Sequence, residues 1–395
     1  MLVDGEYQEP VDPSGDWQAI TDTEIQGVFN FSLDGLNVTR TVVVSNISHT
    51  ITTTLDVERS EASGTAQSLQ LAFPGLARTE SPTVKLGQAE SFSANPISQP
   101  VEAASYISLQ TNDRNSGFAI VMRPAASETE ALSAISLGQY RIAMQSELEA
   151  AAGSSLSLAV DTYTGPNELV RFNQEGYADL PGLFRPNILG RLSLGLIWLL
   201  QWIHGFVGSW GLSIILLTLI FRALIWPLIS TQTKSMFAMQ KMQPKIQALQ
   251  KKYKDDREKL AQEQMKLYKE EGVNPAGGCL PMLLQMPLFI ILWRVFVNFE
   301  FNEGFLWLPD LGLSDPIYIL PILYVGVMLL QSYFSTKGNP GMLRQQVFIN
   351  LVFVFIIVNF PAGVILYFVV SMLVQVFQYW LLSRQQPATA GLATK

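Results

Sequence analysis

Residues 211–230 read GLSIILLTLIFRALIWPLIS, a stretch of twenty residues with a single charged side chain. A helix of this length extends about 30 Å, which matches the hydrocarbon core of a bilayer. Four more apolar segments follow, at residues 278–298, 317–335, 343–359 and 363–382. The last two are separated by a Pro-Ala-Gly turn signal at residues 361–363. The sequence therefore predicts a polytopic α-helical membrane domain, whose five-helix core occupies residues 210–384.

The loops between these segments differ in charge, and the difference predicts which side of the membrane each loop occupies. The 231–277 loop carries ten basic and six acidic residues, whereas the 299–316 loop carries four acidic residues and no basic one. Cytoplasmic loops are enriched in Lys and Arg. We therefore expect 231–277, 336–342 and the C-terminal tail, residues 385–395, in the cytoplasm. The 299–316 loop and the 360–363 hairpin are expected on the outer side.

Residues 188–207 are apolar, but Arg191 and His204 interrupt them. The segment either crosses the bilayer or lies in its interface as an amphipathic helix. Trp198 and Trp202 favour the interface, where indole rings concentrate. The choice decides on which side the first half of the chain lies, and the residues alone leave that side open.

Residues 1–185 are a different kind of chain, acidic and rich in Thr, Val and Ser. They hold 23 acidic and 9 basic residues, whereas residues 186–395 hold 10 acidic and 17 basic ones. Short runs alternate apolar and polar residues, as from Phe29 to Leu33, and turn residues separate the runs. This pattern favours antiparallel strands. We expect an N-terminal all-β sandwich domain over residues 1–185 and assign it no catalytic residue.

The composition gives little support for a metal site, a disulfide bond or nucleic-acid binding. Cys279 is the single cysteine, so no intramolecular disulfide can form. The two histidines, His49 and His204, lie far apart in the sequence. We therefore expect no metal site, no cofactor and no direct nucleic-acid partner for the acidic half of the chain.

Arg222 is the most costly residue of the apolar segments. A charged side chain at the centre of a bilayer costs about 2.5–3.5 kcal/mol even on insertion scales, so it is expected to face a polar interior. None of the five segments contains an Asp or Glu to pair with it. The neutral polar residues available are Thr218, Gln285, Gln331, Asn350, Ser371 and Gln375. Either Arg222 lines a hydrated, positively charged groove, or it is a structural residue that bonds backbone carbonyls or reaches an interface.

The 231–277 loop has apolar residues at helical spacing on both sides of a polar turn near Tyr253, which predicts a helical hairpin. We expect a basic, Met-rich surface on it, because methionine adapts to varied apolar partners. The residues expected to form it are Met236, Met239, Met242, Lys245, Lys251 and Lys252. An equally simple interpretation is a solvated charged loop that only follows the positive-inside rule.

Three stretches resemble the YidC/Oxa family of membrane protein insertases, over about residues 187–384. They are GFVGSWGLSIILLTLIFRALIWPL (205–228), MQPKIQALQKKYKDDREKLAQEQMKLYKEEGVNPAGGCLPMLLQMPLF (242–289) and FPAGVILYFVVSMLVQ (360–375). The resemblance implies a five-helix core around a hydrophilic groove. Arg222 matches the groove arginine, and Thr218 and Tyr367 fall near the positions that meet the substrate helix. Gln285, Gln331 and Phe368 complete the expected substrate groove.

The resemblance also implies location and partners. Residues 186–209 match an interfacial helix, which places the β domain in the periplasm, as in Gram-negative members. The implied protein is a multi-pass protein of the bacterial inner membrane with no enzymatic activity. The implied partners are nascent membrane proteins, the Sec translocon, the ribosome and the lipid bilayer.

Three departures from the family pattern change these expectations. The first ten residues, MLVDGEYQEP, do not form the signal-anchor helix with which Gram-negative members begin, so we expect the first transmembrane helix to be absent. Phe368 stands where a second tyrosine is common, so a hydroxyl contact is lost there. The C-terminal tail is short and carries only Arg384 and Lys395 as basic residues, so we expect ribosome contact to be weak or transient.

Two other classes of protein fit the sequence less well. A small-solute transporter or channel would use the polar residues of the segments to line a path, but the segments contain no acidic residue for ion coupling and no obvious inverted repeat. An intramembrane protease would need a base beside a nucleophile, and neither His49 nor His204 lies in a span near one.

Overall fold

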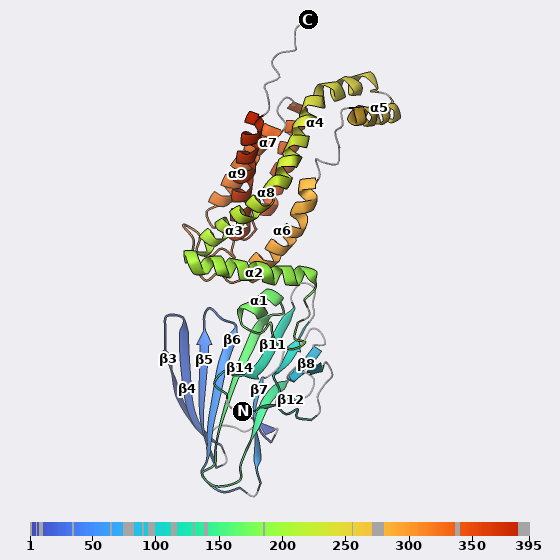
Figure 1. Ribbon diagram of the computed structural model, residues 1–395. Coiled ribbons are helices and arrows are strands. Elements are labelled where there is room, and N and C mark those ends of the chain that lie inside the picture. The colour runs from blue at the N-terminus through green and yellow to red at the C-terminus, as the bar shows by residue number, and fades with distance from the viewer. Residues whose placement is uncertain are drawn as a thin grey trace. The chain divides into compact units, whose positions relative to one another are not determined.

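A computed structural model provides the fold of the chain (Figure 1). The residues that it describes are 2–4, 6–7, 11–33, 35–63, 65–73, 83–88, 91–93, 99–111, 117–128, 131–137, 141–184, 186–254, 256–270, 280–335 and 340–385. The chain divides into two compact units, Met1–Gly190 and Arg191–Lys395.

The first unit is built from two antiparallel sheets. Their strands are β1 (Leu2–Val3), β2 (Glu6–Tyr7), β3 (Val11–Ala19), β4 (Glu24–Leu33), β5 (Leu36–Ser45), β6 (Thr50–Arg59), β7 (Gln67–Phe73), β8 (Thr83–Gln88), β9 (Ser91–Ser93), β10 (Tyr106–Gln110), β11 (Phe118–Pro124), β12 (Ser133–Ser136), β13 (Ile142–Leu148) and β14 (Ser155–Pro166). The five-stranded sheet has the order β12-β13-β7-β1-β2 and the nine-stranded sheet the order β3-β4-β5-β6-β14-β11-β10-β8-β9.

One hydrophobic core joins the two sheets. It contains Leu55 and Leu158 from the nine-stranded sheet together with Leu69 and Ile142 from the five-stranded one. Side chains alternate between the two faces of a strand, so these residues face inward while their chain neighbours face outward. The predicted all-β sandwich is confirmed.

A second, smaller core lies on the other face of the nine-stranded sheet. Tyr106 and Tyr163 of the sheet contribute to it. Phe172, in the short helix α1 (Leu169–Gln174), and Tyr177, just after that helix, complete it. The Tyr163 ring lies 5.2 Å from the Phe172 ring and 5.5 Å from the Tyr177 ring, centroid to centroid. This aromatic cluster fastens α1 to the sheet.

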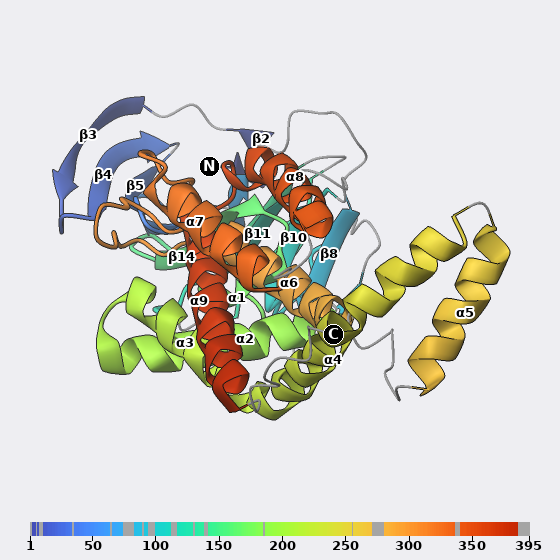
Figure 2. The same ribbon diagram turned by 90° about the horizontal axis from the view of Figure 1, so that it is seen from above.

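The second unit is helical, which confirms the predicted fold class. Its helices are α2 (Ile188–Val207), α3 (Trp210–Leu224), α4 (Trp226–Lys252), α5 (Arg257–Glu270), α6 (Leu280–Asn298), α7 (Ile319–Ser335), α8 (Pro340–Ile357) and α9 (Ala362–Gln385). Helix α9 packs against α3, α4, α6 and α7, and α8 packs against α7. Figure 2 shows α9 running through the middle of these helices.

Helices α2 and α3 meet at a sharp bend of 119°. Gly208 lies between them with a φ of 62°, in the left-handed region that glycine adopts without steric cost. Its N–H donates to the His204 carbonyl at 2.8 Å, which closes the last turn of α2. The axis of α2, residues 188–207, therefore differs sharply in direction from the axis of α3.

The apolar stretch at 211–230 is divided between two helices. Helix α3 ends at Leu224 and α4 begins at Trp226, so the hairpin helix starts before residue 231. Pro227 occupies the first turn of α4, where its missing N–H costs nothing, but it cannot continue a preceding helix. The proline thus accounts for a break that the apolar pattern did not predict.

In the described part of the chain, Ala362–Arg384 is by itself long and apolar enough to cross a membrane. The bent pair of α2 and α3 passes the same criterion only when both helices are taken together. Shorter apolar helices occur at Gln285–Asn298, Ile319–Phe334 and Gln346–Ile357.

Candidate functional site

Arg222 is held within the helical unit by a hydroxyl group. Its Nε donates a hydrogen bond of 2.7 Å to Ser371 Oγ, which joins α3 to α9. Arg222 is 8% exposed and Ser371 is 1% exposed. Among the described residues, no carboxylate forms an ion pair with Arg222. The guanidinium charge is therefore buried and positioned, and no acid in the described part of the chain neutralises it.

Tyr367 extends this contact toward a third helix. It lies four residues before Ser371, so both side chains lie on the same face of α9. The Tyr367 hydroxyl accepts a hydrogen bond of 3.1 Å from Gln285 Nε2 on α6. Arg222, Ser371, Tyr367 and Gln285 thus form a group of polar side chains from α3, α9 and α6. Together with Thr218, we call this group the polar cluster.

Thr218 belongs to the cluster by position. It lies one helical turn before Arg222 and is fully buried. Its hydroxyl donates 2.6 Å to the Ile214 carbonyl of the same helix. The hydroxyl oxygen still has lone pairs to offer, because a hydroxyl is one donor and two acceptors.

Phe368 lies beside the polar cluster and packs against three aromatic rings. Its ring centroid is 5.8 Å from that of Phe289 on α6 and 6.2 Å from that of Tyr324 on α7. The Tyr367 ring lies 5.4 Å from it. An apolar, aromatic wall therefore borders the polar cluster.

Gln331 is not joined to the polar cluster by any described contact. It lies on α7, and its Oε1 is enclosed without a hydrogen-bond partner among the described residues. Its neighbour Ser332 instead accepts a bond of 2.9 Å from Asn350 Nδ2 and links α7 to α8.

Gln378 is a polar contact that sequence reasoning missed. Its Nε2 donates to the Trp226 carbonyl at 3.0 Å and to Ser230 Oγ at 2.9 Å, and the side chain is 1% exposed. It lies seven residues after Ser371, two turns along the same face of α9. That spacing was the available signal: Tyr367, Ser371 and Gln378 form one polar stripe on an otherwise apolar helix.

Loop contacts fix the start of α9 and thus the position of Tyr367. The N–H groups of Ala362 and Gly363 donate to the carbonyls of Leu313 and Leu311 at 2.7 and 2.8 Å. These N–H groups have no partner within their own helix, because the first turn leaves its donors free. The loop that precedes α7 therefore holds the first turn of α9 in place.

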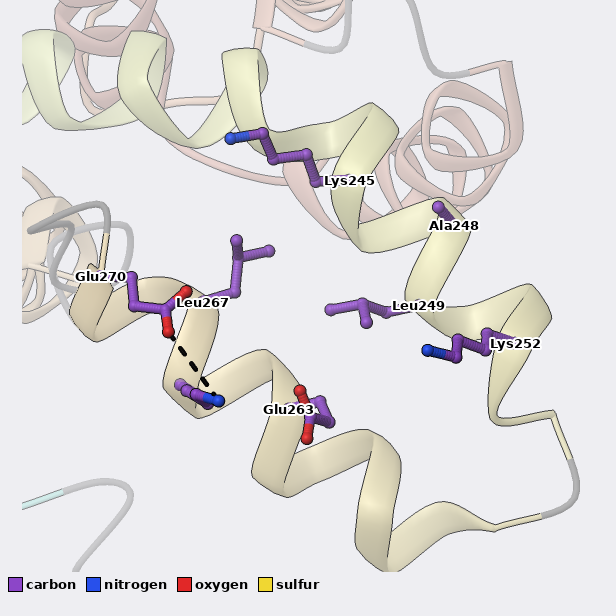
Figure 3. A pocket seen from close by; sticks show the side chains of 8 residues that line it. Lys245, Ala248, Leu249, Lys252, Glu263, Leu267 and Glu270 are labelled. Atoms are coloured by element: carbon purple, nitrogen blue, oxygen red, sulfur yellow. Dashed lines mark ion pairs between the residues drawn. The ribbon is translucent and has the colours of Figure 1, made fainter.

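The hairpin helices α4 and α5 enclose a pocket of about 350 Å³ (Figure 3). Leu249 and Leu267 supply its apolar walls, and Lys245, Lys252 and Glu263 its charged rim. Lys245, Lys251 and Lys252 are exposed, as a basic surface requires.

The expected Met-rich surface needs a correction. Met242 is 3% exposed and Met239 is partly buried, so neither offers an open apolar face, and the Met236 side chain lies outside the described residues. Helical spacing places these methionines on α4 but does not predict which side of α4 other elements cover. Among the hairpin methionines whose side chains are described, Met265 on α5 is the exposed one.

No cluster of three or more His, Cys, Asp or Glu side chains that could hold a metal ion occurs in the described part of the chain. The described groups that the site can use are therefore a buried cation, neutral hydrogen-bonding groups and aromatic rings.

These features define a class: a helical membrane protein with an uncompensated buried arginine, joined to a β-sandwich domain. The family model for the 60Kd inner membrane protein matches residues 202–389. The membrane protein insertase YidC of Deinococcus radiodurans is 36% identical over 375 residues, which cover 92% of this chain and 84% of that relative. The YidC insertase of Francisella tularensis subsp. novicida is 37% identical over 246 residues, 60% of this chain and 44% of that longer relative. The chain belongs to the YidC family of inner-membrane protein insertases.

A solved structure agrees in fold. The crystal structure of an active YidC insertase with its first transmembrane domain resolved matches with a TM-score of 0.57 at 21% identity. The match covers 95% of this chain and 81% of that one. The sandwich and the helical unit thus occur together in a known insertase fold.

Proposed function

We propose that the polar cluster is the substrate-contacting wall of a hydrophilic groove, through which this protein inserts nascent membrane proteins. The observation that carries the proposal is the state of Arg222. It is 8% exposed, its described partner is a neutral hydroxyl, and no described carboxylate pairs with it. A buried charge without a counter-ion is costly, so its presence here supports a use for the charge itself.

The groove lowers the cost of moving polar polypeptide across the bilayer. Water and neutral hydrogen-bonding groups beside Arg222 replace part of the solvent that a client segment leaves behind. The guanidinium attracts acidic residues of that segment, and the attraction is strong where the surroundings have a low dielectric constant. No covalent step is required.

The residues of the proposed groove take different parts in this scheme. Thr218, Gln285 and Gln331 offer hydrogen bonds to the polar segment. Tyr367 and Phe368 offer aromatic surface to the apolar segment that leaves into lipid. Aromatic rings suit this task because they provide large contact area at a small cost in conformational entropy.

Orientation and partners follow from charge and family. The basic hairpin of α4 and α5 and the C-terminus lie in the cytoplasm, and the β sandwich lies in the periplasm. Helix α2 lies in the outer interface, in keeping with its 119° bend against α3. The hairpin meets the ribosome weakly or transiently, and the helical unit works alone or beside the Sec translocon.

Reconstitution of the whole chain in proteoliposomes tests the proposal. Two single-span clients that differ only in the charge of the translocated segment, one acidic and one neutral, are inserted by wild-type protein and by Arg222→Ala. We expect Arg222→Ala to slow the acidic client about tenfold more than the neutral one, which corresponds to about 1.4 kcal/mol of differential interaction.

Arg222→Lys is the matched variant, because it keeps a positive charge but loses the guanidinium geometry. It should retain most of the preference for the acidic client. Equal losses for both clients with Arg222→Ala would contradict the electrostatic role and leave Arg222 as a structural residue.

A further inference from the structure

Helix α4 begins with a segment whose residues favour bending. Pro227 has no N–H to bond the carbonyl one turn earlier, and sharp kinks in helices occur mainly at prolines. Four hydroxyl side chains follow within two turns, and each donates to a carbonyl three or four residues earlier, a pattern that weakens and bends helices. They are Ser230, Thr231, Thr233 and Ser235, with distances of 2.7 to 3.2 Å. We call residues 226–235 the hinge segment.

One further side chain of the hinge segment is poorly satisfied. Gln232 is 7% exposed, and both polar atoms of its amide are enclosed without a hydrogen-bond partner among the described residues. An unpaired buried polar group raises the free energy of the arrangement that contains it. The observed direction of α4 therefore lacks full support from the side chains of α4 itself, and contacts from other helices must supply the rest.

Helix α9 contacts the chain on both sides of the break between α3 and α4. On the α3 side, Ser371 Oγ accepts the bond of 2.7 Å from Arg222 Nε. On the α4 side, Gln378 Nε2 donates 3.0 Å to the Trp226 carbonyl and 2.9 Å to Ser230 Oγ. Ser371 and Gln378 lie seven residues apart, about 10 Å along α9. Because α9 is one continuous helix, these two attachment points set the angle between α3 and α4.

A second contact between α4 and α9 is apolar. The Phe237 ring lies 4.8 Å from the Tyr379 ring, centroid to centroid. Apolar contacts are non-directional, so this pair holds the helices together without fixing their angle. A hydrogen bond has a preferred distance and angle, and Gln378 is 1% exposed, so water does not compete for its amide. Among the described contacts, those of Gln378 are therefore the ones that give α4 a defined direction.

We propose that Gln378 is a positioning residue, which fixes the hinge segment and thereby the direction of the basic hairpin relative to Arg222. The inference rests on the proposed insertase function and adds a residue on which insertion depends without contact to the client. Gln378 acts through α4, because its described partners are a carbonyl and a hydroxyl of that helix. Without these bonds α4 takes several directions, and insertion is slowed in proportion to the fraction that remains competent.

A distance measured across the hinge segment tests this role without any client. Spin labels are attached through Leu219→Cys on α3 and Lys241→Cys on α4, two exposed positions on opposite sides of the hinge segment. The background carries Cys279→Ser, because Cys279 is the single cysteine. In proteoliposomes, double electron–electron resonance should give a narrow distance distribution with Gln378 present and a broader one with Gln378→Leu. Leucine fills much of the same space but forms no hydrogen bond.

Insertion of the neutral single-span client is the second measurement. We expect Gln378→Leu to lower the insertion rate about two- to tenfold, the change in population that corresponds to the loss of an ordinary hydrogen bond. Gln250→Leu is the matched control, because Gln250 is an exposed glutamine of α4 beyond the hinge segment. It should change neither the distance distribution nor the insertion rate.

Pro227→Ala separates positioning from a general loss of stability. Alanine restores the N–H and removes the clash of the proline ring with the preceding turn, so the junction of α3 and α4 becomes stiffer. In this background, Gln378→Leu should broaden the distances less and slow insertion less than it does in the wild type. A Gln378 that only stabilises the fold would cause equal losses in both backgrounds, because independent effects add.

The outcomes distinguish the inference from the function on which it rests. An unchanged distance distribution for Gln378→Leu would overturn the inference, as would equal losses with and without Pro227→Ala. A broader distribution with an unchanged insertion rate would also overturn it, because insertion would then not depend on the direction of α4. Failure of the wild-type protein to insert either client would instead overturn the proposed function, while the distances would still show whether Gln378 fixes α4.

Discussion

Arg222 and Ser371 are 149 positions apart in the chain, yet Arg222 Nε donates a hydrogen bond of 2.7 Å to Ser371 Oγ. The bond fixes the guanidinium against α9 with a neutral acceptor. A carboxylate in the same place would have held the arginine more strongly but would have cancelled its charge. The arrangement therefore keeps a positive charge available inside the helical unit while limiting its movement.

Loss of this bond should weaken the fold measurably. Ser371→Ala leaves the Arg222 donor unpaired in a buried site, and a hydrogen bond to a charged group contributes about 1.5–3 kcal/mol. We expect a lower unfolding midpoint in detergent, measured by circular dichroism. Ser383→Ala is the matched control, because Ser383 lies on the same helix, is exposed and bonds only the Trp380 carbonyl of its own turn. Equal midpoints for the two variants would contradict the role given to Ser371.

The bond between Gln285 and Tyr367 can be measured by a double-mutant cycle. Tyr367→Phe and Gln285→Leu each remove one partner of the 3.1 Å contact between α6 and α9. We expect the double variant to be less destabilised than the sum of the single ones, with a coupling of about 0.5–1.5 kcal/mol. Additive effects would show that the two side chains do not interact in the membrane-embedded protein.

Two glycines in helices should respond in opposite ways to the same substitution. A Cβ on Gly211 would overlap the Phe305 ring, whereas a Cβ on Gly326 would meet nothing within 4 Å. Gly211→Ala should destabilise the helical unit by about 1–3 kcal/mol through overpacking. Gly326→Ala should stabilise α7 by up to about 1 kcal/mol, because alanine is the better helix former. Thermal unfolding of the two variants, measured side by side, tests whether the unfolding midpoint falls for Gly211→Ala and rises for Gly326→Ala.

The β sandwich should lose stability in alkali. Burial raises the pKa of Tyr106 and of Tyr177 above the ordinary value of 10.0. Since the folded pKa is raised, the unfolded chain releases these protons first, and stability present below pH 10 declines as the pH rises above it. We expect unfolding of the strands to begin above about pH 10, together with the appearance of tyrosinate absorbance.

Tyr106→Phe provides the internal check on that pH dependence. It removes one titrating group together with the 2.7 Å bond to the Pro181 carbonyl. The variant should be less stable at neutral pH but lose less stability between neutral pH and the alkaline range. Tyr7→Phe, at a position 70% exposed, should leave the alkaline profile unchanged. A Tyr106→Phe profile parallel to that of the wild type would refute the assignment.

The sequence predicted the two fold classes because each rests on local patterns. Alternation of period two is present in β4 and β5, and an apolar run of membrane length is present in α9, whereas α3 reaches that length only together with α2. Thr218 and Arg222 share a face by helical spacing alone. The break before Pro227 was not predicted, although proline is favoured in the first turn of a helix.

The contacts between helices could not be predicted from local patterns. Nothing in the spacing of α9 indicates that Ser371 bonds Arg222 or that Gln378 bonds Ser230. The burial of Met242 and the unpaired amide of Gln232 depend on which elements cover α4. Such facts follow from packing between distant segments, and a single sequence carries no direct record of them.

Site-specific photocrosslinking tests the central claim most directly. Photoreactive residues placed singly at positions 218, 222 and 367 are exposed to light during synthesis of a small single-span membrane protein, with position 383 on the exposed side of α9 as the control. The account predicts crosslinks to the nascent chain from the first three positions and none from the control. Crosslinks only to neighbouring helices of the protein itself would mean that Arg222 is structural and that clients take another path.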